Sequence, residues 1–145
     1  MDDGDTIGHG ANVAGIIGGN NVDVAKYANT ISVKVLARVK EVARIVEAIE
    51  WLLKQVAASG NPSIINMSLV SGGKSRQDVD EILRVAVARG VHVVAAAGNE
   101  NRDARDLTPS SSGYSDGWRV HDPRRTLEIY WLTCSKPLNR INVVV

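Results

Sequence analysis

Three short apolar segments alternate with two amphipathic helices in the central part of the chain, and this order limits the possible folds more than any other feature. Residues 30–36, 64–69 and 91–97 are rich in β-branched residues and are predicted to be strands. Residues 39–58 and 77–89 place apolar side chains three and four positions apart, which predicts helices. Strands separated by helices pair in parallel through right-handed crossovers. We therefore expect an α/β fold, with a parallel sheet flanked by helices.

A histidine lies between two glycines near the start of the chain, just before an almost entirely apolar segment. His9 follows Gly8, and residues 9–18 are predicted to form a helix that ends in the glycines and asparagines of residues 18–21. The segment is apolar on nearly every side, so the helix is expected to be buried inside a domain. An ionisable ring at the start of a buried helix suggests a general base, although a capping or structural histidine explains the same residue.

Several motifs resemble one protein family and occur in that family's order. Residues 8–15 resemble the Gly-His-Gly-Thr-His-Val-Ala-Gly motif of the subtilisin-like serine proteases, the subtilases or peptidase S8 family. Residues 32–36 resemble the strand that follows, and residues 59–69 and 93–101 are similar to the proteinase K-like branch. The resemblance covers residues 4–110 and implies an incomplete subtilisin-like fold with three layers.

The resemblance also implies roles for particular side chains. His9 matches the general base that takes a proton from a serine nucleophile, and Asn99 matches the side-chain donor to the oxyanion. Ser68 and Leu69 match a strand that binds the substrate, in which Val70 replaces a glycine and is expected to crowd a pocket wall. Without the resemblance, Asn99 would be interpreted as a turn residue.

Two parts of the family's catalytic apparatus have no match. The family's aspartate lies on a strand upstream of the histidine motif, and Asp2, Asp3 and Asp5 are too close to His9 for that position. The nucleophile lies in a Gly-Thr-Ser-Met-Ala segment, which the 145 residues do not contain. The Gly-Ser-Gly strand that lines the family's cleft is also absent. We therefore expect a fragment of a serine endopeptidase that does not hydrolyse peptide bonds by itself.

Two other functions stay open. A non-catalytic pseudoprotease module would keep part of the cleft and bind peptides or a protease partner. A nucleotide-binding protein would use the glycines of the first motif as a phosphate loop, but no apolar strand precedes them and no phosphate-loop lysine follows. The glycines in question are Gly8, Gly10, Gly15, Gly18 and Gly19.

Composition limits the possible partners. Seventeen basic and 16 acidic residues give a net charge of +1, which argues against nucleic acid or an anionic membrane as a partner. The chain has no apolar run of membrane-spanning length and no secretory signal, while the family resemblance implies a peptide or protein substrate and an extracellular location. No cofactor is expected. Calcium is possible by family resemblance, without an assigned site, and the aspartates before His9 are better explained as a solvated arm.

The chain divides at the point where the resemblance stops. We expect a partial subtilase catalytic domain over residues 1–110 and a divergent tail over residues 111–145. Two of the three tryptophans and the single cysteine, Cys134, lie in this tail. Two explanations stay open: the tail is disordered, or it is read in a displaced frame, because codons can be chosen whose displaced frame spells a family-like Thr-Val-Met-Val-Gly-Ala segment. Residues 141–145 again resemble the family in the original frame.

Overall fold

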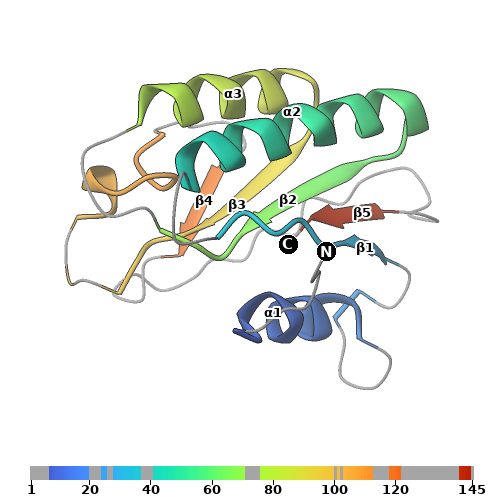
Figure 1. Ribbon diagram of the computed structural model, residues 1–145, viewed down its shortest axis with the longest axis horizontal. Coiled ribbons are helices and arrows are strands. Elements are labelled where there is room, and N and C mark those ends of the chain that lie inside the picture. The colour runs from blue at the N-terminus through green and yellow to red at the C-terminus, as the bar shows by residue number, and fades with distance from the viewer. Residues whose placement is uncertain are drawn as a thin grey trace.

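The chain forms a parallel sheet with helices on both sides, which confirms the expected α/β fold (Figure 1). This computed structural model describes residues 7–19, 24–25, 28–36, 41–70, 76–99, 101, 103–112, 118–121 and 141–144. In chain order the elements are α1 (His9–Gly18), β1 (Ala28–Ile31), α2 (Glu41–Ser59), β2 (Ser63–Met67), α3 (Gln77–Ala88), β3 (His92–Ala96), η1 (Ala104–Asp106), β4 (Trp118–His121) and β5 (Ile141–Val144).

The five strands do not follow one another in chain order across the sheet. Their order is β1-β5-β2-β3-β4, so that β5 lies between β1 and β2. Val144 of β5 pairs with Ile31 on one side and with Ile65 on the other. At the far edge, β4 pairs with β3. Both β4 and β5 come from the segment that the sequence marks as a divergent tail.

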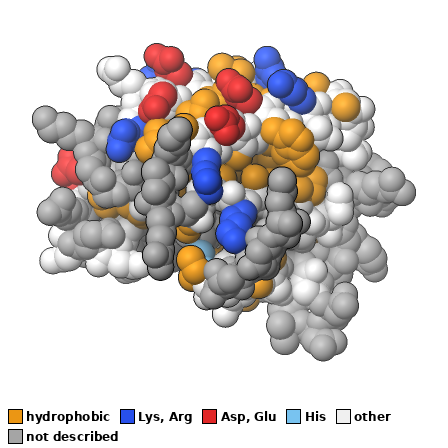
Figure 2. All heavy atoms as spheres, viewed as in Figure 1, with side chains coloured by type: hydrophobic (Ala, Val, Ile, Leu, Met, Phe, Trp, Pro, Cys, Tyr) orange, Lys and Arg blue, Asp and Glu red, His pale blue; other side chains and the backbone are white. Residues whose placement is uncertain are grey.

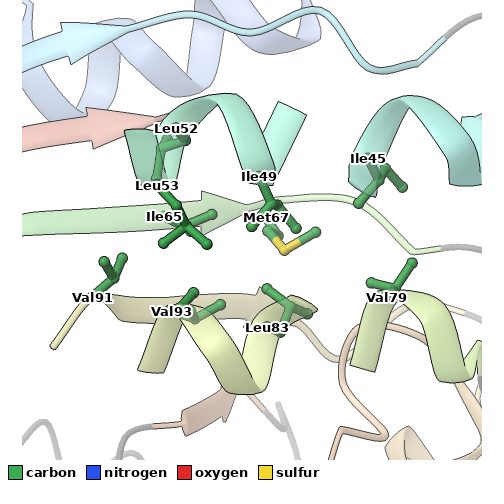
Figure 3. Close-up of a cluster of buried hydrophobic side chains, with 11 residues drawn as sticks. Ile45, Ile49, Leu52, Leu53, Ile65, Met67, Val79, Leu83, Val91 and Val93 are labelled. Atoms are coloured by element: carbon green, nitrogen blue, oxygen red, sulfur yellow. The ribbon is translucent and has the colours of Figure 1, made fainter. Parts of the chain in front are cut away.

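The hydrophobic core lies between the sheet and the two longer helices (Figure 3). Ile49 and Leu53 of α2 are buried, as the periodicity predicts, and Leu83 of α3 is fully buried. Met67 and Val93 contribute from the strands below. The three-and-four spacing of apolar residues predicts the inward faces of both helices, and every described residue of that pattern belongs to the core or packs against it. Val39, the first apolar residue of the pattern, lies outside the described residues. The complete cluster is Ile45, Ile49, Leu52, Leu53, Ile65, Met67, Val79, Leu83, Ala86, Val91 and Val93.

Helix α1 lies on the opposite side of the sheet and packs against β1 (Figure 1). The prediction that this helix is buried is wrong: none of its ten residues is buried, and Ile16 is 54% exposed. The reason is the lack of a second packing partner, because among the described elements only β1 makes substantial contact with α1. Gly18 permits that contact, since a side-chain carbon there would lie 2.7 Å from Oγ1 of Thr30.

The three predicted strands are present, and their lengths follow from their pairing. The first was expected over residues 30–36, but β1 covers Ala28–Ile31 and residues 32–36 continue without strand pairing. The difference arises because the described part of β5, the strand beside β1, ends at Val144. The β2 and β3 strands fall within one residue of their predicted starts and within two of their predicted ends.

A polar loop after β3 is attached to the start of α3 by buried hydrogen bonds. Thr108 Oγ1 accepts a hydrogen bond of 3.0 Å from the backbone N–H of Arg76. Ser112 donates from its hydroxyl to the Asp80 carboxylate, and both of these residues are buried. Ser110 donates to the carbonyl of Leu107 at 2.7 Å. Ordered packing therefore continues through Ser112, slightly beyond the end of the family-like motifs.

Candidate active site

The predicted substrate-binding residues and the predicted oxyanion donor lie at the carboxyl ends of neighbouring parallel strands, where sites on such sheets form. Ser68, Leu69 and Val70 follow β2, and Asn99 follows β3. These four residues line one cavity of about 520 Å³. Gly98 has a φ of +89°, a left-handed conformation that glycine adopts without strain, and it turns the chain directly before the exposed Asn99.

His9 reaches the same region from the other side of the sheet. It is the first residue of α1 and follows Gly8, whose φ of +78° also lies in the left-handed region. The exposed imidazole lines a second cavity of about 320 Å³, which shares Ser68 and Leu69 with the first. The structure thus places all five residues that the sequence nominates on two adjoining cavities at the ends of β2 and β3. Their roles in chemistry stay predictions.

A hydrogen bond joins the histidine to the strand end. His9 Nε2 lies 2.8 Å from the carbonyl oxygen of Ser68. A carbonyl oxygen can only accept, so Nε2 must carry the hydrogen and donate it. A nitrogen that already holds a proton cannot take one from a nucleophile. In this arrangement, His9 can act as a base through Nε2 only after the hydrogen bond to Ser68 has opened.

Asn66 is a site residue that the motif comparison missed. Its Nδ2 donates a hydrogen bond of 3.0 Å to Oγ of Ser68, and it lines both cavities. Ser68 is therefore held at its backbone by His9 and at its hydroxyl by Asn66. The sequence does carry a signal for this role, because Asn66 places a polar amide between Ile65 and Met67 in a mostly apolar strand. An amide that is covered by the protein needs a hydrogen-bond partner.

The described residues form neither a cluster of metal ligands nor a membrane-spanning helix. The described residues contain no group of three potential metal-binding side chains, and Asp2, Asp3, Asp5 and Cys134 lie outside them. Over the helices, acidic and basic side chains are interspersed on the face that Figure 2 shows. Within the described part of the chain, no helix is both long and apolar enough to cross a bilayer.

Three of the five glycines of the first motif have structural explanations. A side chain at Gly18 would meet Thr30, and one at Gly19 would overlap the carbonyl of Gly15. Gly8 provides the left-handed residue before the helix. Close packing and a tight turn account for these positions without a bound phosphate.

Comparison with known proteins agrees with the motifs. A model of the subtilase family matches residues 2–136. Subtilisin-like protease 2 of Arthroderma otae is 40% identical over 111 residues, which are 74% of this chain and 26% of that protein. A protein of the same name from Trichophyton verrucosum is 39% identical over the same shares of the two chains. A subtilisin-like protease of Coccidioides posadasii is 40% identical over 74% of this chain and 27% of its own length.

The chain spans about a quarter of the length of these relatives. The family match extends over most of the 145 residues and includes His9, Ser68 and Asn99. The motifs, the parallel sheet and the comparisons agree, and the chain belongs to the subtilase family.

Proposed function

We propose that this chain carries the general base and the oxyanion donor of a subtilase catalytic domain, together with one wall of its substrate cleft. The observation that carries the proposal is the gathering of His9, Asn99 and residues 68–70 at the ends of β2 and β3. The substrate would be an extended peptide or protein segment that pairs with residues 68–70 by strand addition. An extracellular location belongs to the same proposal, because it follows from the family resemblance.

The chain by itself is proposed to be inactive in peptide hydrolysis. The 145 residues contain no Gly-Thr-Ser-Met-Ala nucleophile segment, and no aspartate segment of the family type lies upstream of His9. Nucleophile, base and aspartate act as a unit, and loss of the nucleophile alone costs about 10⁶-fold in rate. Asn99 contributes only after a nucleophile has attacked. The hydrogen bond from Nε2 of His9 to Ser68 supports the same conclusion.

The test is hydrolysis of a chromogenic peptide by the purified chain. We expect a rate equal to that of the His9→Ala variant and no effect of a serine-directed inhibitor. Asn12→Ala is the matched control, because Asn12 is an exposed polar residue on the same helix. Turnover that disappears in His9→Ala and persists in Asn12→Ala would refute the proposed inactivity and indicate an unrecognised nucleophile.

A second candidate is a peptide-binding module without catalysis. The observation in its favour is that the cavity of about 520 Å³ beside residues 68–70 is open although the chain holds no recognisable nucleophile. Val70 is half-buried and lines this cavity. We expect Val70→Gly to bind a fluorescent peptide more tightly and Val70→Phe to bind it more weakly, because the second side chain fills the cavity. Equal affinities of both variants for the peptide would count against binding at this cleft.

A further inference from the structure

Asp80 carries a buried carboxylate that the proposed function does not use. It lies in the first turn of α3, is 8% exposed, and accepts a hydrogen bond from the hydroxyl of Ser112, which is also buried. A covered carboxylate is costly unless hydrogen bonds satisfy it, so this contact holds Ser112 against α3. Ser112 lies in the loop that follows Asn99. The contact therefore joins a core helix to the chain segment that carries the candidate oxyanion donor.

Hydrogen bonds continue from Ser112 back toward Asn99. The backbone N–H of Ser112 donates to the carbonyl of Pro109 at 3.2 Å. The carbonyl oxygen of Ala104 lies 2.8 Å from the hydroxyl of Ser110 and is an acceptor for it. Ala104 begins η1 and comes five residues after Asn99. The network thus reaches from α3 almost to the end of β3.

The backbone around Asn99 is bent, and the shape of the bend depends on both of its ends. Gly98 has a φ of +89° and Asn101 a φ of +53°, so a left-handed residue lies on each side of Asn99. Outside glycine, this conformation persists only where the surrounding structure holds it. Pairing of β3 with β2 holds one end of the bend, and the network that begins at Asp80 holds the other.

We propose that Asp80 is a positioning residue: by holding Ser112, it fixes the loop of residues 103–112 and thereby the direction in which the Asn99 carboxamide faces the cleft. The proposal rests on the proposed function for the role of Asn99 as oxyanion donor. Such a donor is effective only when it is oriented before the charge develops. Asp80 is not among the residues that line the cavity beside Asn99, so it acts through the loop.

The test compares NMR spectra of variants of the full chain. Asp80→Ala removes the carboxylate, whereas Asp80→Asn keeps an oxygen that can accept the hydrogen bond from Ser112. Asp78→Ala is the matched control, because Asp78 is an exposed carboxylate in the same turn of α3 and accepts from the N–H of Val79. Ser112→Ala breaks the contact from the side of the loop and decides the result if Asp80→Ala does not fold.

The readout is the side-chain amide resonance of Asn99, which is assigned by its absence from the spectrum of Asn99→Ala. In Asp80→Ala and Ser112→Ala, we expect this resonance to move toward that of a freely rotating asparagine side chain. Amide exchange at residues 97–99 should become roughly tenfold faster in both variants, because loss of the hydrogen bond favours local opening. Asp80→Asn and Asp78→Ala should keep the resonance and the exchange rates of the parent chain.

An Asn99 resonance that stays in place in folded Asp80→Ala or Ser112→Ala would overturn the proposal. So would an equal displacement in Asp78→Ala, or a displacement in Asp80→Asn as large as that in Asp80→Ala. These spectra contain no peptide. They therefore test Asp80 separately from the proposed function, which the peptide measurements test.

Discussion

The two faces of the sheet carry layers that differ sharply in burial. On one face, α2 and α3 pack on each other and on the strands, and most of the buried hydrophobic side chains among the described residues lie there. On the other face, α1 has no buried residue. Apolar character is not the cause of the difference, since α1 has fewer charged side chains than α2. A helix becomes buried only when a second surface covers it. Among the described elements, α1 packs on β1 alone, whereas α2 has both α3 and the sheet as partners.

The largest expected effect contrasts the two layers directly. Leu83→Ala removes a fully buried side chain from α3, and we expect it to lower the free energy of unfolding by about 2–5 kcal/mol. Ile16→Ala, on α1, removes a side chain that is 54% exposed, and we expect a loss below about 1 kcal/mol. Urea unfolding of dilute protein measures both changes. Similar losses would show that α1 is covered in solution.

Two threonine variants, Thr108→Val and Thr30→Val, are expected to change the free energy of unfolding by an intermediate amount. Thr108→Val leaves the backbone N–H of Arg76 without its acceptor, and we expect a loss of about 1–3 kcal/mol. Thr30→Val should instead stabilise the protein by about 0.5–1 kcal/mol, because Oγ1 of Thr30 is buried with no partner among the described residues. The measurement is again urea unfolding. A loss of stability in Thr30→Val would mean that its hydroxyl has a partner in solution.

The smallest expected effect concerns the hydrogen bond that joins α1 to the end of β2. His9→Ala removes the bond to Ser68 and should speed amide exchange in α1 by an amount that corresponds to about 0.5–1.5 kcal/mol. Asn12→Ala, at an exposed position of the same helix, should leave that exchange unchanged. Exchange in α3 serves as the internal reference. If the two variants exchange alike in α1, the bond contributes nothing to docking of the helix.

The sequence predicts those parts of the fold that depend on a local, periodic pattern of apolar residues. The inward face of α3 follows from Val79, Leu83 and Ala86, whose spacing marks one side of a helix. Burial of α1 could not be predicted in this way, because it depends on which surfaces cover the helix. The place of β5 is equally non-local, because Ile31 and Val144 are far apart in sequence.

The candidate site also has a part that the sequence predicts and a part that only the structure shows. His9, Ser68 and Asn99 were found because each lies in a motif, and only the structure shows that they line adjoining cavities. Asn66 lies in a motif as well, but its role rests on the distance to Ser68, which sequence does not reveal. The reading-frame explanation of about residues 113–139 stays a hypothesis. The coding DNA decides it, because stop codons in the displaced frame would rule it out.

The position of β5 has a consequence for the order in which the chain can fold. The ladder partner of β1 is synthesised about 110 residues after β1 itself, which corresponds to roughly 5–20 s at about 5–20 residues per second. During that interval, the edges of β1 and β2 that face each other have no strand between them. Pairing over such a separation is also intrinsically slow after release. The nascent chain is therefore most exposed to edge-to-edge association just before its sheet closes.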